Sequence, residues 1–166
     1  MHRASSPRPN PVSLPAVALA DEAATADLGG RVARCAEAGD VIALWGDLGA
    51  GKTVFARGFL RALGIEDEVP SPTFTLLQTY NTAPAMIYHF DLYRLESPDE
   101  VWELGIEDAL AGGISVIEWP DRIAAMLPAD RLDVNLDLAT TGRQARLVGH
   151  GGWASRVGEL GFDQSD

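Results

Sequence analysis

The residues with the clearest chemistry form one glycine-rich motif, Gly46-Asp-Leu-Gly-Ala-Gly-Lys-Thr53. The motif matches the pattern G-x-x-x-x-G-K-[ST] at every fixed position, which is typical of a phosphate-binding loop. Glycines let the backbone turn tightly and bring its N–H groups close to a phosphate, and a following helix adds unsatisfied donors at its N-terminus. We therefore expect Lys52 to reach the β- and γ-phosphates of a nucleotide, and the Thr53 hydroxyl to bind Mg²⁺.

A phosphate loop requires a buried strand before it and a helix after it, and the sequence predicts both. Val41 to Trp45 is a continuous apolar run of strand length, which is typical of a strand covered on both faces. Residues 52–63 have the pattern of a helix that ends at Gly64. The alternative interpretation is a glycine-rich turn followed by an unrelated lysine. The strand–loop–helix context favours the phosphate loop.

A nucleotide-bound Mg²⁺ takes few protein ligands, so one carboxylate at the end of a neighbouring strand is enough. Two further apolar runs end in an acid, one at Asp91 and the other at Glu118. Either acid is a candidate for the metal site, and the alternative is that each pairs with a nearby arginine, such as Arg94 or Arg122.

His89 lies two residues before Asp91, so both side chains point to the same side of the predicted strand. This histidine either lines the site or is a structural residue of the core. Trp45 and Trp119 adjoin the phosphate loop and the second acid, respectively. We expect both to be packing residues whose positions also make them reporters of nucleotide binding.

The other segments predict an α/β fold, specifically the three-layer sandwich of P-loop NTPases, with a mainly parallel central sheet and antiparallel additions. Helices are expected at 21–38, 97–111 and 120–127, and strands at 12–20, 74–80, 85–93, 114–119, 131–139 and 144–148. Residues 12–160 are predicted to form a single domain, between a disordered tail at 1–11 and a frayed end at 161–166.

Composition narrows the class of protein. A chain of 166 residues with 46% apolar residues is typical of one globular domain. The formal net charge of −11 repels phosphate backbones, so direct binding of RNA by this chain alone is not expected. A lone cysteine, Cys35, fits a reducing compartment. The apolar stretch Val12 to Ala20 is short and interrupted by Pro15, so we expect no secretion, no membrane span and a cytoplasmic location.

Several motifs, taken in order and spacing, resemble the TsaE family of bacterial ATPases, which help to make threonylcarbamoyladenosine on tRNA. The motifs are GDLGAGKTVFARGFLRALG (46–64), SPTFTL (71–76), YHFDLYRL (88–95), ELGIEDAL (103–110) and VIEWPDR (116–122). The segments DEAATADLG and GRQARL near the two ends are also similar. The phosphate loop is shared by many families, whereas HFDLYRL together with SPT and EWP is far more specific.

The resemblance implies a role for each matching residue. Lys52 would be the phosphate lysine, Thr53 and Glu118 would hold Mg²⁺, and Asp91 would act in catalysis near the γ-phosphate. The segment Ser71-Pro72-Thr73 would be a mobile loop that senses nucleotide. The resemblance also implies that residues 22–25 border the nucleoside. The predicted nucleotide-binding residues are Gly46, Asp47, Leu48, Gly49, Ala50, Gly51, Lys52, Thr53, Gly142 and Arg143.

The function expected from the resemblance is ATP hydrolysis that serves the other proteins of the bacterial tRNA threonylcarbamoyl transfer complex, with tRNA bound only through that complex. Arg57 and Arg61 are predicted to point away from the γ-phosphate, so hydrolysis should be slow without partners. Three alternatives remain. They are a small-molecule kinase, although no arginine-rich lid is evident, a nucleotide sensor that does not hydrolyse, and a GTPase. Against the GTPase, no Asn-Lys-x-Asp element begins at Asn10, Asn81 or Asn135.

Overall fold

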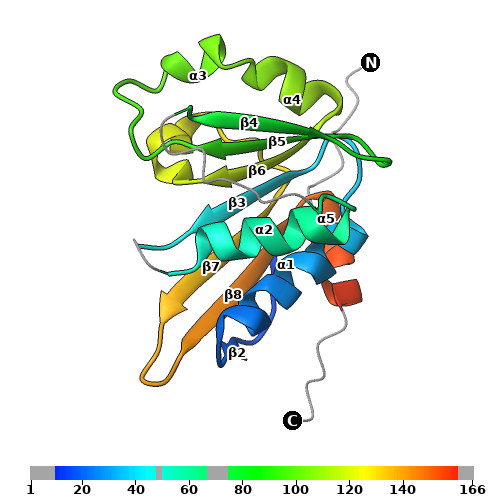
Figure 1. Cartoon of the computed structure of the whole chain (residues 1–166), viewed down its shortest axis with the longest axis vertical. Helices are drawn as coiled ribbons and strands as arrows, with labels where there is room; N and C mark the ends of the chain where they lie inside the picture. The colour runs from blue at the N-terminus through cyan, green and yellow to red at the C-terminus, as the bar shows by residue number, and fades with distance from the viewer. Residues whose placement is uncertain (1–9, 48–49, 67–74, 161–166) are drawn as a thin grey trace, which may run out of the picture.

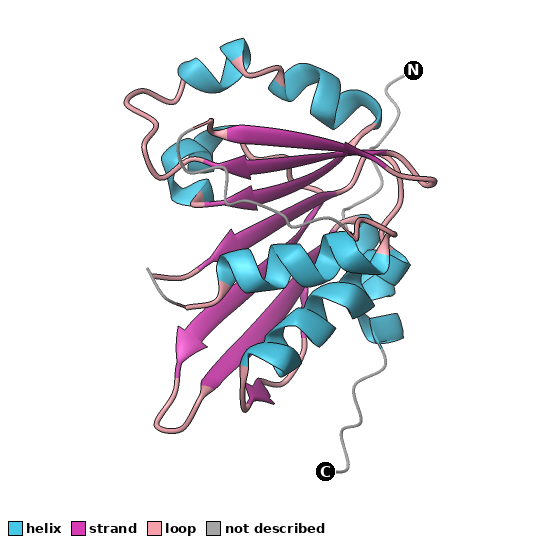
Figure 2. Ribbon diagram, viewed as in Figure 1, coloured by secondary structure: helices cyan, strands magenta, loops and turns pink. Residues whose placement is uncertain are grey.

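The computed structural model describes residues 10–47, 50–66 and 75–160 and is built on one eight-stranded sheet (Figures 1 and 2). The strand order is β1-β8-β7-β3-β6-β5-β4, and β2 also pairs with β8. The strands are β1 (Val12–Ser13), β2 (Val17–Leu19), β3 (Val41–Trp45), β4 (Leu77–Asn81), β5 (Met86–Asp91), β6 (Ile114–Glu118), β7 (Arg131–Leu138) and β8 (Arg143–His150). The helices are α1 (Glu22–Cys35), α2 (Lys52–Ala62), α3 (Glu100–Glu103), α4 (Ile106–Gly112) and α5 (Gly152–Arg156), with 3₁₀ helices η1 (Pro120–Met126) and η2 (Val157–Leu160).

The centre of the sheet is parallel and its margins are antiparallel. β3 pairs in parallel with β6 and β7, and β5 pairs in parallel with β6. The hairpin partners β4 and β8, and the short strands β1 and β2 that lie on β8, run antiparallel. Because parallel strands place their carboxyl ends at one edge, the loops after β3, β5 and β6 meet there. The predicted α/β class and sandwich are confirmed.

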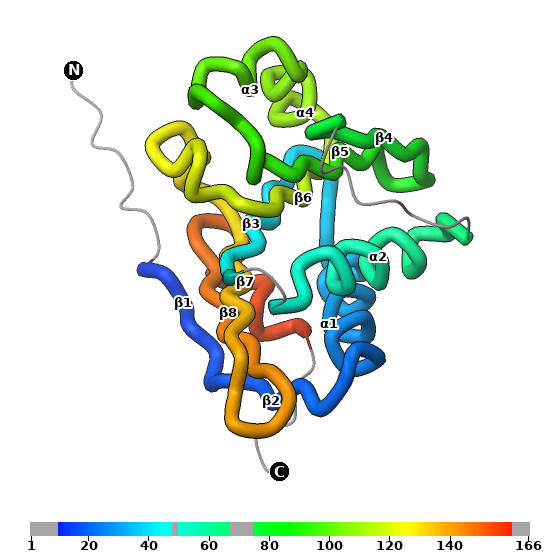
Figure 3. The backbone as a smooth tube through the Cα atoms, turned by 60° about the vertical axis from the view of Figure 1, so that its left-hand side comes forward, coloured from blue at the N-terminus to red at the C-terminus, as the bar shows by residue number. Residues whose placement is uncertain are grey.

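Helices α1 and α2 cover one face of the sheet and lie side by side (Figures 1 and 3). Asp21 caps α1, since its carboxylate accepts a hydrogen bond of 2.9 Å from the Ala24 N–H. The core on this face combines apolar residues of both helices, the inner strands, α5 and η2. It includes Val32, Phe55 and Trp153, each with at most 1% of its surface exposed.

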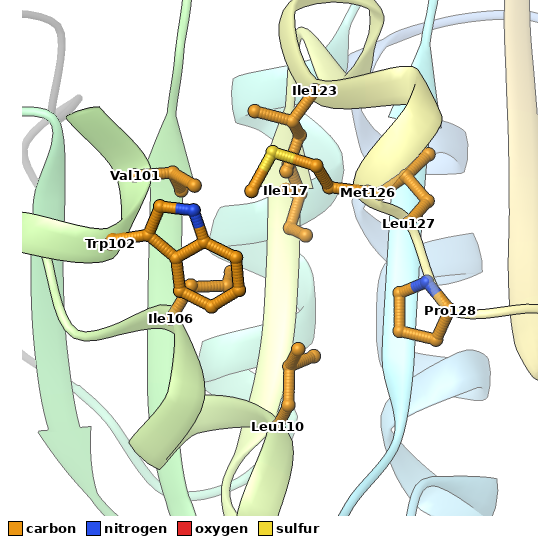
Figure 4. A pocket seen from close by; sticks show the side chains of 9 residues that line it. All are labelled: Val101, Trp102, Ile106, Leu110, Ile117, Ile123, Met126, Leu127 and Pro128. Atoms are coloured by element: carbon orange, nitrogen blue, oxygen red, sulfur yellow. The ribbon is translucent and has the colours of Figure 1, made fainter. Parts of the chain in front are cut away.

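The opposite face is covered by α3, α4 and η1, which are all short. The continuous helix predicted at 97–111 is wrong, because the chain breaks between α3 and α4 at Gly105, where φ is +89°. At the start of α3, the Glu100 carboxylate accepts a hydrogen bond of 3.1 Å from the Glu96 N–H. An apolar cleft opens between these short helices, with Trp102 at its lip (Figure 4).

Three smaller differences from prediction concern where elements divide, where they end and which type of helix forms. The strand expected at 12–20 is divided into β1 and β2 around Pro15. Helix α1 ends at Cys35 rather than at residue 38. The segment after Trp119 is a 3₁₀ helix with a non-helical residue at Ile123, and not an α-helix. The predicted tail at 1–11 and frayed end at 161–166 fall largely outside the described residues.

Candidate functional site

The glycine-rich loop connects β3 to α2, as the motif predicts. Gly46 has a φ of +147° and Gly51 a φ of +104°, both in the left-handed region that favours glycine. A Cβ on Gly46 would lie 2.4 Å from the Leu136 carbonyl oxygen, so the loop has no room for a side chain there. Asp47 and Ala50 continue the loop, whereas Leu48 and Gly49 lie outside the described residues. The loop is therefore followed directly by the N-terminus of α2.

Lys52 begins α2 and folds back over the loop. Its ammonium group donates hydrogen bonds to the carbonyl of Gly46 and, over 3.1 Å, to that of Asp47. The same nitrogen lies 3.8 Å from the centre of the Trp119 ring, in a cation–π contact. Burial lowers the pKa of Lys52, and nearby carboxylates, of which Glu118 contributes most, act in the opposite direction. The carbonyls of Gly46 and Asp47 and the Trp119 indole thus hold the Lys52 ammonium group beside the loop.

Asp91 and Glu118 end adjacent parallel strands and lie directly beside each other in the register of β5 and β6. Both are buried, with 5% and 2% of their surfaces exposed. The Thr53 hydroxyl donates to Glu118 Oε1 over 2.9 Å, so the helix that follows the loop contacts the second acid. Asp91 accepts a hydrogen bond of 3.1 Å from the Tyr93 N–H. The two predicted acids and the predicted metal hydroxyl therefore meet at one edge of the sheet.

This donor set suits Mg²⁺. A hydroxyl oxygen and a carboxylate oxygen 2.9 Å apart, on Thr53 and Glu118, are hard ligands of the kind that Mg²⁺ prefers. No group of three or more His, Cys, Asp or Glu side chains able to hold a metal occurs among the described residues. A hydroxyl and a carboxylate leave coordination positions for water and for phosphate oxygens, which Mg²⁺ commonly keeps. The residues present fit the ion.

Trp119 follows Glu118 with a φ of +61°, an uncommon conformation for a residue with a large side chain. This backbone geometry accompanies the placement of the indole over Lys52 and against the Tyr93 ring, whose centroid lies 4.8 Å away. The sequence predicted Trp119 as a packing residue near the metal ligand, and the contact with Lys52 was not predicted. Only the adjacency of Trp119 to a strand-ending acid could have suggested it.

Arg143 reaches the end of the loop from the start of β8, and Gly142 precedes it in the turn between β7 and β8. Gly142 has a φ of +72°, and a Cβ there would lie 2.6 Å from the Leu19 carbonyl oxygen. A Cβ on Gly51 would lie 3.5 Å from Arg143 Cδ and 3.3 Å from Thr25 Cγ2. The start of β8 and the first turn of α1 thus border the end of the loop. The nucleotide contacts predicted for Gly142, Arg143 and residues 22–25 stay predictions.

Two polar contacts at the site were missed by sequence reasoning. His89 Nε2 lies 2.6 Å from Glu118 Oε2, within the core. Trp45, expected to be a packing residue and a reporter of nucleotide, donates its indole N–H to Asp133 over 2.8 Å. The same carboxylate binds Arg131 and His150, each over 2.8 Å. Both contacts join different strands, so their detection requires the strand order.

Residues of the predicted switch segment, Ser71, Pro72 and Thr73, lie outside the described residues. Among the residues that the structure does describe, no helix is both long and apolar enough to cross a bilayer.

The chain is similar to known proteins both in sequence and in fold. The family model described as "Threonylcarbamoyl adenosine biosynthesis protein TsaE" matches residues 19–147. A tRNA threonylcarbamoyladenosine biosynthesis protein TsaE from Rickettsia felis is 45% identical over 121 residues, which cover 72% of this chain and 71% of that protein. The protein of the same name from Treponema pallidum is 40% identical over 125 residues, which cover 75% of this chain and 92% of that protein. The crystal structure of YdiB from Bacillus subtilis has a TM-score of 0.74 at 30% identity, covering 91% of this chain and 94% of that one.

Proposed function

Because the chain belongs to the TsaE family of threonylcarbamoyl adenosine biosynthesis proteins, we propose that it binds and hydrolyses Mg²⁺–ATP in the cytoplasm, in support of the threonylcarbamoyladenosine modification of tRNA. The observation that carries the proposal is the meeting of Lys52, Thr53, Asp91 and Glu118 at the carboxyl ends of β3, β5 and β6. A positive charge, a metal hydroxyl and two acids at one loop are the parts that phosphoryl transfer to water needs.

Each residue has a defined task in this mechanism. Lys52 places its ammonium charge on the β- and γ-phosphates, while the loop backbone donates hydrogen bonds to the phosphate oxygens. Thr53 and Glu118 hold Mg²⁺, directly or through water. When bound, the ion neutralises the charge that develops on the phosphate oxygens. Asp91, beside Glu118, orients the water whose oxygen attacks the γ-phosphorus as the bond to the ADP oxygen breaks. Trp119 covers Lys52 and limits the access of other water.

The chain is proposed to act with the proteins that perform the threonylcarbamoyl transfer, and to meet tRNA only within that complex. Its net charge of −11 supports this arrangement, because a strongly acidic surface repels nucleic acid. Arg57 and Arg61 are exposed on α2, which supports slow hydrolysis by the isolated chain. An arginine supplied by a partner typically raises such rates by about 10³ to 10⁵.

Lys52→Ala tests the assignment of the loop. The variant should bind ATP weakly or lose turnover, because it lacks the charge that faces the phosphates. ATP affinity is measured by calorimetry and turnover by phosphate release. Glu118→Ala should abolish hydrolysis and leave metal-free ATP binding intact. Loss of Mg²⁺ dependence in Asp91→Ala, with no change in Glu118→Ala, would show that the roles of the two acids are exchanged.

A second experiment separates this function from the alternatives. Phosphate release is measured for the chain alone, with the purified transfer proteins, and with those proteins and tRNA. We expect slow phosphate release by the chain alone and faster release when the transfer proteins are present. Transfer of the γ-phosphoryl group to a nucleoside or a small acid would identify a kinase. Binding of ATP without phosphate release under all three conditions would identify a nucleotide sensor.

A further inference from the structure

His89 is the buried partner of the proposed metal ligand Glu118. The two carboxylate oxygens of Glu118 have different partners, since Oε1 accepts from the Thr53 hydroxyl over 2.9 Å and Oε2 lies 2.6 Å from His89 Nε2. A carboxylate held at both oxygens has one defined orientation. The oxygen that faces Thr53 is thereby the one presented to the metal site.

The sheet register explains why His89 can reach Glu118. His89 lies opposite Val116, and Asp91 lies opposite Glu118, in the parallel pairing of β5 with β6. Residues two apart in a strand share a face, so His89 and Glu118 are diagonal neighbours on the same side of the sheet. This is also the side on which α2 presents Thr53. The contact is therefore built by three separate elements.

Within the described part of the chain, the only hydrogen bond of the His89 side chain is the one to this carboxylate. None of its surface is exposed, and its other ring nitrogen, Nδ1, has no hydrogen-bond partner within the described part of the chain. A neutral ring with its proton on Nε2 satisfies the short contact and leaves no buried N–H unpaired. An unpaired polar atom in the core costs free energy, so an apolar side chain would suit a position that only fills the core. The histidine at this position therefore indicates a polar role, which is the contact with Glu118.

We propose that His89 is a positioning residue for the magnesium site, which donates its Nε2–H to Glu118 and turns the other carboxylate oxygen toward Thr53 and the ion. The inference rests on the proposed function, because it assigns Glu118 to the metal. A group that hydrogen-bonds to a metal ligand, without touching the metal itself, fixes the orientation of that ligand. Removal of such a group typically lowers metal affinity about 10- to 100-fold. His89 contributes through Glu118 and touches neither the nucleotide nor the ion.

The test compares His89→Gln, whose side chain keeps an N–H donor, with His89→Leu, which has none. Mn²⁺ is titrated into each protein in the presence of ADP, and free Mn²⁺ is followed by electron paramagnetic resonance. We expect His89→Leu to bind Mn²⁺ about 10- to 100-fold more weakly than the unmodified chain. His89→Gln should recover most of that loss. ADP affinity without metal should be the same in all three proteins.

Ser115→Ala is the matched control, because Ser115 is also a fully buried polar residue of the adjacent strand, with a hydroxyl that lacks a partner in the described part of the chain. Its Mn²⁺ affinity should be unchanged. Equal Mn²⁺ affinity in His89→Leu and the unmodified chain would overturn the positioning role while leaving the proposed function intact. Equal losses in His89→Leu and Ser115→Ala would also overturn it, since they would indicate a general disturbance of the sheet. Failure of the unmodified chain to bind Mn²⁺ with nucleotide would overturn both proposals.

Discussion

The two faces of the sheet are covered in different ways. On one face, the backbones of α1 and α2 nearly touch, since a Cβ on Gly58 would lie 2.0 Å from the Ala26 carbonyl oxygen and one on Gly29 would lie 2.2 Å from that of Phe55. On the other face, α3 and α4 have four and seven residues and leave a cleft beside Trp102. Figure 1 shows the contrast between the long neighbouring helices α1 and α2 and the short helices α3 and α4.

The two faces differ in how tightly their helices pack because only one of them positions residues of the site. Helix α2 begins with Lys52 and Thr53, so any tilt of this helix moves the phosphate loop and the metal hydroxyl together. Reciprocal glycines let α1 and α2 approach closely and fix that tilt. The described residues of α3 and α4 contribute apolar cover for the sheet, which tolerates looser packing. We therefore expect equivalent substitutions to cost more free energy of unfolding on the α1–α2 face.

Two tryptophans give the largest expected contrast. Trp153 packs on the α1–α2 side with 1% of its surface exposed, whereas Trp102 on the opposite face is 49% exposed. Trp153→Ala should reduce the free energy of unfolding by about 3 to 5 kcal/mol, because it leaves a large cavity. Trp102→Ala should cost less than about 1 kcal/mol, since half of that side chain is already in water. Urea unfolding measures both, and equal losses would contradict the difference between the faces.

A pair of glycines tests the close approach of the helices directly. Gly58→Ala should cost about 3 kcal/mol, because its new methyl group would overlap a backbone carbonyl and force α1 and α2 apart. Gly112→Ala is the control at the end of α4, where an added Cβ meets no atom within 4 Å. It should be neutral or slightly stabilising. Thermal unfolding compares the two, and a tolerated Gly58→Ala would show that the helix pair can separate at little cost.

Arg156 provides the next contrast, because it ties α5 to the α1–α2 face. Its guanidinium makes two hydrogen bonds of 2.7 Å to Asp40 and one of 2.9 Å to the Cys35 carbonyl, and it lies 4.1 Å from the Trp153 ring. The hydrogen bond to Asp40 raises the pKa of Arg156 further. Arg156→Ala should cost about 2 kcal/mol by leaving Asp40 without this partner.

Arg156→Lys should recover part of that loss, because it keeps the charge but not the paired geometry. The measurement is urea unfolding at low and at high salt. If the loss in free energy of unfolding disappears at high salt, the interaction is a screened surface ion pair. Arg156 would then not be one of the contacts that stabilise this face.

The sequence predicted the site best where positioning is local. The loop, Lys52 and Thr53 follow one another between β3 and α2, so the motif alone places them. The meeting of Asp91 with Glu118 depends on β5 lying beside β6, and the sequence could suggest only that both acids end strands. The contacts of His89 with Glu118 and of Trp119 with Lys52 also require the strand order and an unusual backbone angle. No periodicity carries that information.

The fold was predicted well in its apolar strands and less well on the loosely covered face. Helical spacing continues through residues 97–111, so a single helix was the natural interpretation. A glycine within such a pattern is compatible with either a helix or a break. The left-handed angle at Gly105 decides between them, and it turns the chain so that both α3 and α4 lie against the sheet.

Apart from the control variants, Gly105→Ala gives the smallest expected effect, and it tests the origin of that break. A Cβ at this position would meet no atom within 4 Å, so the cost comes from the backbone angle of +89° and not from a clash. Placing alanine in a left-handed conformation costs about 1 to 2 kcal/mol, and the looser packing here lets part of that strain relax. We therefore expect a loss of about 1 kcal/mol with an unchanged far-ultraviolet circular dichroism spectrum. Gly105→Asn should cost less, because asparagine tolerates this angle better. A gain in helical signal without loss of stability would instead show that α3 and α4 join once the glycine is removed. In that case the glycine alone maintains the break, and the packing of Val101 and Ile106 against the sheet does not.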